Sequence, residues 1–157
     1  MSWLSRRIPK LFAVVALLAT ATKPGVAKDL DLLIRYLVPV FLSQDLAEAC
    51  RGKPGFLSDL PHGAASVDET SQKIKFEVTD GLDSSEAPWV DLAAANTALK
   101  AARTEMRKLA DADGHIPAGT LDTWCFASAQ PLILKIMRAN EQSQSQMLAA
   151  IRRAKSD

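Results

Sequence analysis

Apolar residues recur at three- and four-residue intervals over most of the chain after residue 28, and this spacing predicts amphipathic helices. The first run, 30–50, is apolar on more than one side, which predicts a helix buried on several faces. Pro39 lacks a backbone N–H, so we expect it to kink or split this helix, with Ser43 capping a second piece at 44–50. Two breaks rich in glycine and proline then predict a loop over 51–65.

The segment 66–80 fits two secondary structures. Ser66 and Glu69 have the spacing of a capping box, apolar residues follow with a helical period, and Gly81 is placed to end a helix. The stretch 74–79 also alternates strictly between apolar and polar residues, as a strand would. A lone strand would leave backbone groups unpaired, and no other segment offers a convincing partner strand. We therefore favour a helix and keep the strand as the alternative.

Residues 86–109 carry the clearest helical pattern. Pro88 near the first turn and the acidic residues around it suit a helix start, and cations gather toward the other end. The apolar positions alternate steps of three and four, which is typical of the packing seam of a bundle helix. This predicted seam consists of Leu92, Ala95, Leu99, Ala102, Met106 and Leu109.

The last predicted helix begins at Thr120, which we expect to cap it, and bends at Pro131. The tail, 141–157, is polar and then weakly amphipathic, which predicts a helix that frays. These segments make about four helices joined by loops. The predicted fold is therefore all-α: a roughly four-helix up-and-down bundle with kinked first and last helices, in a single α-helical domain over 28–157.

Residues 1–27 have the composition of a secretory signal peptide. Basic residues, among them Arg6 and Arg7, precede an uncharged apolar run, and 25–27 supplies the small residues of a cleavage site. The run is shorter than the ~20 apolar residues that span a bilayer, so cleavage is favoured over an uncleaved anchor. The paired arginines leave open a choice between the general secretory route and twin-arginine export. The predicted mature chain begins at Lys28 and is periplasmic or secreted, without stable membrane insertion.

Composition and charge narrow the class of protein. The chain has 157 residues, of which 24% are charged and 48% are hydrophobic, and this excludes disorder throughout and fits one domain. Removing residues 1–27 takes away four basic residues and no acidic one, so the formal net charge falls from +1 to −3. A mildly acidic chain argues against nucleic acid, and against an anionic membrane surface, as its ligand.

Cys50 and Cys125 are the only cysteines in the chain. An even number of cysteines in an exported chain predicts a disulfide. Redox or metal chemistry is the alternative, but the chain has no Cys-x-x-Cys motif and no histidine next to either cysteine in sequence. Cys50 ends the first predicted helix and Cys125 lies one turn into the last. Antiparallel packing of these two helices would therefore bring the two cysteines together.

The most suggestive candidate for a ligand site is the segment 111–115. Asp111, Asp113 and Gly114 match positions 3, 5 and 6 of a calcium-binding loop, and His115 adds a further potential ligand. The first and last carboxylates of such a loop are missing, because a leucine and a threonine stand at those positions. We therefore favour a turn in which Gly114 has a positive φ, with the metal site as the weaker hypothesis.

Sequence motifs give little support to an enzyme. The chain lacks the Gly-x-Ser-x-Gly elbow and a glycine-rich phosphate loop. His62 and His115 are the only histidines and lie in separate predicted loops, where a surface position is commoner than a ligand or catalytic role. We therefore predict neither a catalytic residue nor a cofactor, although a carboxylate pair formed only in the folded chain would leave no sequence motif.

Three large aromatic residues lie near predicted helix starts: Trp89, Trp124 and Phe126. They could fill the core or mark a surface that binds a partner, and the usual burial of such residues favours the core. Trp124 adjoins Cys125, so we expect it to pack against the disulfide. Trp89 would point to a partner surface if it were exposed.

These features favour a non-enzymatic binding or accessory protein of the periplasm, which meets another periplasmic protein through a helix face. The alternative is a small-ligand- or metal-binding protein, or an enzyme, that uses the 111–115 turn or the bundle interior. A third hypothesis is a structural envelope component that associates with itself through its helices. A concave pocket with convergent polar groups would favour the alternative, and an exposed apolar patch bordered by charge would favour the first hypothesis.

Overall fold

The computed structural model describes residues 28–156, and every regular element in that range is helical. The elements are α1 (Leu30–Ala49), α2 (Ala65–Thr79), α3 (Glu86–Arg107), α4 (Thr120–Trp124), the π-helical turn η1 (Cys125–Ala129), α5 (Gln130–Gln142) and α6 (Gln144–Lys155). Because α4, η1 and α5 follow one another without a gap, they form one continuous helix, which makes five helices in the described range. The all-α prediction is confirmed. The predicted signal peptide, 1–27, lies outside the described residues.

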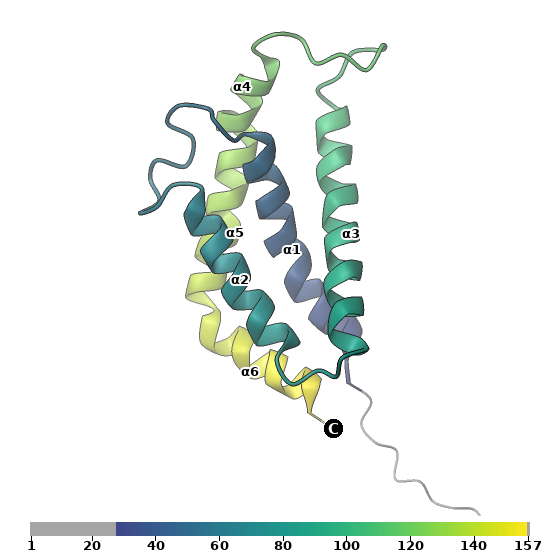
Figure 1. The fold of residues 1–157 in the computed structure, drawn as a ribbon. Helices are drawn as coiled ribbons and strands as arrows, with labels where there is room; N and C mark the ends of the chain where they lie inside the picture. The colour runs from purple at the N-terminus through teal and green to yellow at the C-terminus, as the bar shows by residue number, and fades with distance from the viewer. Residues whose placement is uncertain (1–27, 157) are drawn as a thin grey trace, which may run out of the picture.

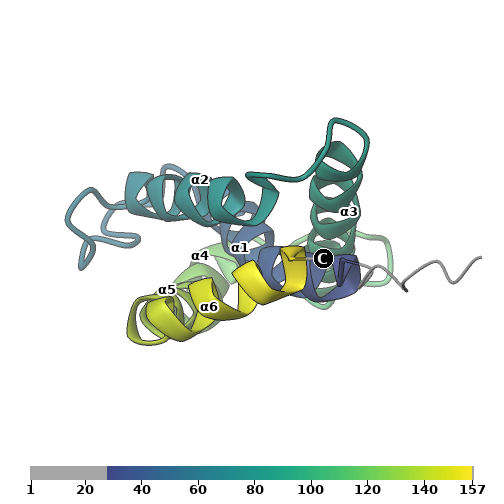
Figure 2. The same ribbon diagram turned by 90° about the horizontal axis from the view of Figure 1, so that it is seen from below.

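From α1 to the α4–α5 helix, successive helices run in opposite directions (Figure 1). The helices α1 and α3 point one way, and α2 and the continuous α4–α5 helix point the other way. Seen along the bundle, α2, α3 and α5 surround α1, while α6 lies across one end (Figure 2). The most extensive contact is between α1 and α3. This arrangement is the predicted up-and-down bundle, with its first helix at the centre.

The core consists of two clusters of buried apolar residues, one toward each end of α1. The cluster near the disulfide contains Leu46, Ala47, Cys50, Phe56, Leu57, Val67, Ala102, Cys125, Ala129 and Ile133. The cluster near the chain ends contains Leu33, Leu37, Val40, Ile74, Val78, Val90, Ala94, Ile151 and Ala154. Residues of α1 belong to both clusters, and α2, α3 and α5 surround this helix, which explains why it is apolar on more than one side.

Cys50 and Cys125 form the predicted disulfide, with their Cα atoms 5.8 Å apart. The bridge joins the end of α1 to the π-helical turn, so the first and last helices pack antiparallel as expected. Both cysteines are fully buried, and Trp124 packs against their cluster from a partly buried position. A buried disulfide of this kind is compatible with an oxidising compartment and stabilises the fold.

The segment 66–80 is helical, so the strand alternative is wrong. Ile74 and Val78 are buried on one side of α2, and Gly81 has a φ of +77°, as expected of a residue that ends a helix. The capping box is also wrong, because α2 begins one residue before Ser66. The Ser66 hydroxyl instead accepts the backbone N–H of His62 at 3.2 Å, four residues back in the loop.

The face of α3 that packs on α1 differs from the predicted seam. Val90, Ala94, Ala98 and Ala102 are buried, whereas Leu92 is 60% exposed. Both sets of residues recur at helical spacing, so the periodicity is compatible with either face. The smaller alanine side chains allow the two helices to approach closely. The predicted seam is therefore not the core face of α3, although Ala102 belongs to both sets.

The helix α1 continues unbroken through Pro39. Ser43 lies buried inside it, and its hydroxyl donates to the carbonyl of Val40 at 2.7 Å. The predicted split, with Ser43 capping 44–50, is therefore wrong. A proline removes one helical hydrogen bond, and burial of the flanking apolar residues offsets that loss here. Within 28–156, neither α1 nor another helix combines the length and the hydropathy needed to cross a membrane.

The continuous α4–α5 helix is irregular close to Pro131. Its N-cap is Gly119, with a φ of +81°, so the prediction that Thr120 caps this helix is wrong by one residue. The π-helical turn, 125–129, ends two residues before Pro131. Proline has no N–H to donate to the carbonyl of Ala127, and a local widening of the helix accommodates this loss. The distortion falls where the sequence predicted a bend.

The polar tail forms a packed helix, α6, and not the frayed extension that its composition suggested. Ile151 and Ala154 are buried in the cluster near the chain ends. The carbonyl of Ala154 also accepts the backbone N–H of Asp29 at 2.9 Å. The burial of Ile151 and this bond to the start of α1 hold α6 in place, which a count of its polar residues did not indicate.

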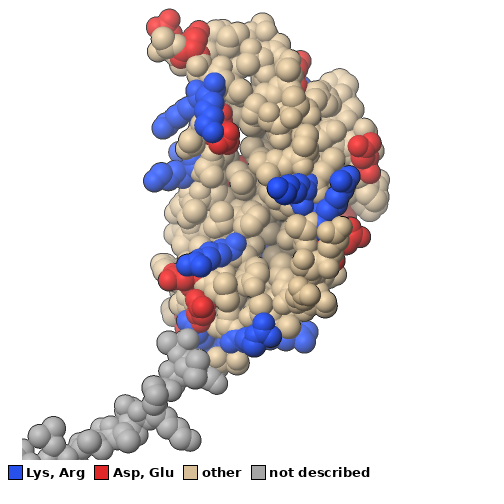
Figure 3. Space-filling model, turned by 180° about the vertical axis from the view of Figure 1, so that it is seen from behind, with Lys and Arg blue, Asp and Glu red and all other residues tan. Residues whose placement is uncertain are grey.

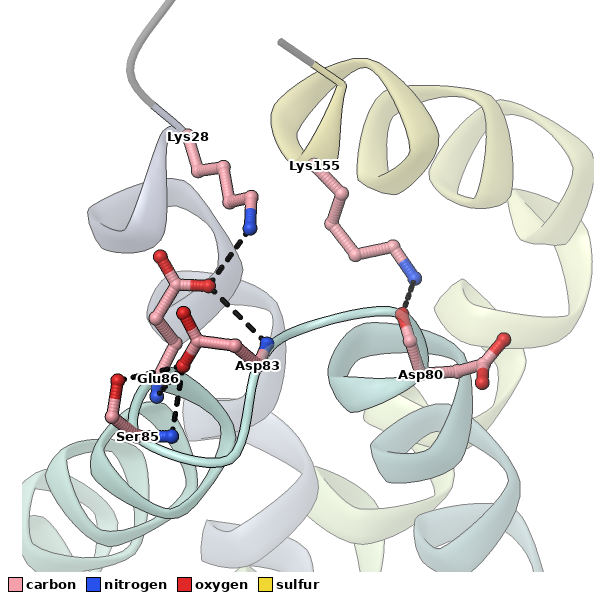
Figure 4. Close-up of polar contacts among 6 residues, drawn as sticks. All are labelled: Lys28, Asp80, Asp83, Ser85, Glu86 and Lys155. Atoms are coloured by element: carbon pink, nitrogen blue, oxygen red, sulfur yellow. Dashed lines mark hydrogen bonds and ion pairs between the residues drawn. The ribbon is translucent and has the colours of Figure 1, made fainter.

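Both ends of the described chain are attached to the loop between α2 and α3 (Figure 4). The ammonium group of Lys28 lies 2.9 Å from the carboxylate of Glu86 at the start of α3. The ammonium group of Lys155 donates to the carbonyl of Glu77 at 2.7 Å and also to the carbonyl of Asp80. A cation at the C-terminus of α2 is favourable, because the last carbonyl groups of a helix carry partial negative charge.

Candidate functional site

A groove with a volume of about 560 Å³ opens between the 59–62 loop, α2 and the junction of α5 with α6. Five apolar side chains from these segments line it: Leu60, Ile74, Leu134, Met137 and Met147. Two of the five are methionines, whose unbranched side chains adapt to irregular apolar surfaces. The groove therefore offers an apolar and adaptable floor.

The fold brings this floor together from distant parts of the chain. The chain turns at Ser143, between α5 and α6, so that Met137 and Met147 line the same groove. The loop wall is held by a backbone bond, in which the N–H of Leu60 donates to the carbonyl of Leu57 at 3.0 Å. Leu57 is itself buried in the cluster at the disulfide. The groove is thus a product of tertiary packing and not of one amphipathic helix.

The rim of the groove carries charges of both signs. Its acidic residues are Asp59, Glu69 and Glu141, and its basic residues are Lys73 and Arg138. All five are exposed. On the face opposite to Figure 1, basic and acidic side chains are likewise interspersed with uncharged surface, without one continuous basic patch (Figure 3). The rim of the groove is therefore of mixed charge and not uniformly acidic or basic.

His62 is the titratable residue of the rim that has a defined partner. Its Nδ1 lies 2.9 Å from a carboxylate oxygen of Glu69, and both side chains are largely exposed. Covalent catalysis would need a nucleophile next to such a base. The nearby Ser66 hydroxyl instead accepts the backbone N–H of His62, while the imidazole faces the carboxylate. His62 and Glu69 therefore form a surface contact that shapes the rim, while Ser66 is buried beneath it.

The 111–115 segment forms a turn closed by its own carboxylate. Asp111 Oδ1 accepts the backbone N–H groups of Asp113 at 3.1 Å and of His115 at 2.8 Å. Gly114 has a φ of +80°, as expected for the turn. Nowhere within 28–156 do three or more His, Cys, Asp or Glu side chains gather in a way that could hold a metal ion. The carboxylate of Asp111 thus serves the backbone in this conformation.

The aromatic residues expected in the core divide into two groups. Trp124 is partly buried at the disulfide, as expected, whereas Trp89 and Phe126 are exposed, so the core prediction is wrong for both. The ring of Phe126 meets the ring of Phe56 edge to face, with centroids 6.1 Å apart. This contact helps attach the 51–64 loop to the continuous α4–α5 helix. Trp89 lies at the start of α3 and is available to a partner.

A second, smaller hollow of about 270 Å³ lies where the end of α1 meets the start of α2. Gln44 donates to the carboxylate of Asp68 across it, at 3.1 Å. Partial burial raises the pKa of the neighbouring Asp45 carboxyl, and the nearby guanidinium of Arg103 on α3 opposes this shift. At this level of the bundle, an acidic group of α1 thus interacts with a basic group of α3.

Sequence reasoning had considered His62, with Asp59 as a possible carboxylate partner, but had not placed either residue in a groove. The structure keeps His62 and His115 apart, since the former lines the groove and the latter closes the 111–115 turn. Met137 and Met147 were not selected as site residues. Their apolar character was visible in the sequence, but their convergence depends on the turn between α5 and α6.

Comparison of the chain with models of protein families, with curated proteins and with solved structures found no match in any of the three.

Proposed function

We propose that the protein is an exported helical binding protein that holds an apolar segment of another periplasmic protein in the groove between α2, α5 and α6. One observation carries the proposal: five apolar side chains from separate segments converge in this groove, inside a rim of both charges. Export is supported by the composition of residues 1–27 and by the buried disulfide, which suits an oxidising compartment.

A protein segment fits the groove better than a small molecule does. Small-molecule sites enclose most of the ligand surface, with a few polar groups placed inside. Here the charged groups, such as Lys73 and Arg138, lie exposed on the rim around an apolar floor. An amphipathic helix could lay its apolar side on Met137 and Met147 while its charged flanks meet the rim.

A photo-crosslinking amino acid introduced at Lys73 tests this proposal in intact cells. We expect a cross-linked product of defined mass that is lost when Met137→Glu places a charge on the groove floor. Met106→Glu is the matched control, because it introduces the same change at a half-buried methionine of α3 outside the groove. Arg138→Glu is a second groove variant at an exposed position, where folding is not at risk, and it should also reduce the product.

The outcomes of this experiment separate the hypotheses. No cross-link, or a cross-link that survives both Met137→Glu and Arg138→Glu, would contradict binding in this groove. Loss of the product with Met106→Glu as well would contradict it too, since that residue lies on α3. A bound small molecule, recovered by mass spectrometry of the purified protein and absent from Met137→Glu, would instead establish the ligand-binding alternative.

Export is tested separately by the N-terminus of the protein recovered from the periplasm. Mass spectrometry should find Lys28, or a residue within a few positions of it, as the first residue. An intact chain that begins at Met1 and is found in the membrane fraction would contradict the proposal of a cleaved signal peptide.

A further inference from the structure

The three most exposed large apolar side chains in the described part of the chain all lie on α2 and α3. Phe76 of α2 is 65% exposed, and Leu92 and Trp89 of α3 are 60% and 49% exposed. A scattered exposed leucine needs no explanation, but an apolar patch shared by two neighbouring helices marks an interaction surface.

These three side chains point to the same side of the α2–α3 pair. The ion pair between Lys75 and Asp91, at 2.8 Å, joins the two helices, and Phe76 and Leu92 are the next residue on each. The two helices run in opposite directions (Figure 1). Because each residue advances by about 100° around its helix, the next residue on each helix turns to the same side of the pair. Trp89 lies one helical turn from Leu92 on α3. We call Phe76, Trp89 and Leu92 the outer α2–α3 patch.

Charges of opposite sign flank this patch. Near its start, α2 carries the exposed residues Asp68 and Glu69, and the second half of α3 carries exposed basic residues, namely Lys100, Arg103 and Arg107. The two groups lie at a similar level of the bundle, because Gln44 bonds Asp68 while the adjacent Asp45 interacts with Arg103. On this surface, the start of α2 therefore carries acidic residues and the second half of α3 carries basic ones.

We propose that this surface joins two copies of the chain about a two-fold axis parallel to the bundle. Such an axis places α2 of one copy opposite α3 of the other copy. Phe76 then lies opposite Trp89 and Leu92 of the other copy, and the acidic start of α2 lies opposite the basic half of α3. A two-fold axis produces each of these contacts twice.

The charge pattern favours a second copy over an unrelated partner. A partner with one sign of charge would match one helix and be repelled by the other. A second copy, related by this axis, matches both helices at once. Glu69 borders both this surface and the groove, whereas the groove residues Met137 and Arg138 lie on α5, outside the outer α2–α3 patch. The two surfaces can therefore be tested independently.

Sedimentation of the protein purified from the periplasm tests the proposal. We expect the mass of two copies, with dissociation on dilution and at high salt, because salt screens exposed charges. Leu92→Glu should give a monomer. Leu132→Glu, the same change at an exposed leucine of α5, is the matched control and should leave the dimer intact. A monomer at every concentration, or a dimer that persists in Leu92→Glu, would overturn the proposal.

Cysteine cross-linking tests the axis itself. Copies with Phe76→Cys, mixed with copies with Leu92→Cys, should form an interchain disulfide on mild oxidation more readily than either variant alone. Preferential linkage of Phe76→Cys to itself would place α2 against α2 and overturn the proposed arrangement. The groove variant Arg138→Glu should leave the dimer unchanged, so that failure of the dimer is distinguishable from failure of groove binding.

Discussion

The side-chain carbonyl of Gln130 accepts the backbone N–H of Leu57 at 2.9 Å, although 73 residues separate the two in the chain. Leu57 is fully buried and has a φ of +57°, a conformation that is rare for a residue with a Cβ atom. A buried N–H without a partner costs free energy, so Gln130 stabilises this part of the loop. Together with the disulfide, this bond attaches the loop that forms one wall of the groove to the continuous α4–α5 helix.

Replacing Gln130 with alanine should therefore destabilise the protein. Gln130→Ala leaves the N–H of Leu57 buried without its partner, for which the expected cost is about 1–3 kcal/mol in the free energy of unfolding. Gln142→Ala, at the exposed end of the same helix, is the matched control and should stay within about 0.5 kcal/mol of the unchanged protein. Urea unfolding of the two variants measures the difference, and equal midpoints would contradict the role given to Gln130.

The disulfide between Cys50 and Cys125 should make a larger contribution. It closes a loop of 75 residues, for which the chain-entropy relation gives about 4.5 kcal/mol. Reduction, or the double variant Cys50→Ala with Cys125→Ala, should lower the melting temperature, because the unfolded chain regains conformational freedom. Thermal unfolding with and without a reductant measures this change. Two thiols that are readily alkylated in the denatured, non-reduced protein would show that no bridge exists.

The fold class followed from local patterns, because helical spacing and a pair of cysteines are visible without knowledge of the packing. The segment that ends at Gly81 shows this best, since its helical period and its stop residue agree and no partner strand was present. The choice between the two apolar faces of α3 was different. Leu92 and Val90 both fit a helical period, and only the approach of α1 decides which one is buried.

The groove could not be predicted for the same reason. Met147 lies in a tail that looked weakly amphipathic, and its contact with the groove requires that α6 fold back against α2 and α5. Leu57 is a further example, because nothing in its residue type indicates a positive φ. By contrast, Gly114 in the 111–115 turn was predicted to have a positive φ and does, since glycine is the residue that adopts it without strain.

The loop between α2 and α3 should make the protein less stable as the pH falls into the acidic range. The hydroxyl of Ser85 donates to the Asp83 carboxylate, as do the backbone N–H groups of Ser85 and Glu86, and these bonds lower the pKa of Asp83 below 3.8 (Figure 4). The folded state therefore binds the proton of Asp83 less readily than the unfolded state does. This contribution to stability is present above pH 3.8 and is lost as the pH falls through the lower, folded pKa.

The variant Ser85→Ala tests this dependence, because it removes the largest cause of the pKa shift. We expect the loss of stability below pH 3.8 to be smaller in Ser85→Ala than in the unchanged protein, with little difference in slope at neutral pH. Ser84→Ala, at the exposed neighbouring serine, is the control and should follow the unchanged protein. Melting temperatures measured across the acidic range provide the comparison, and identical profiles for Ser85→Ala and Ser84→Ala would contradict the prediction.

The 111–115 turn allows a decision between a backbone role and a metal site. Gly114 has a φ of +80°, and the space around it is open, so Gly114→Ala should cost about 1 kcal/mol through backbone strain alone. Asp111→Asn keeps an oxygen that can accept the N–H groups of Asp113 and His115, so the double variant with Asp113→Asn should stay within about 0.5 kcal/mol. A metal site would behave differently, since a bound cation stabilises the folded state by mass action. If the segment is only a turn, millimolar calcium should leave the melting temperature unchanged. A calcium-dependent rise that the double variant abolishes would refute the backbone role and establish a metal site.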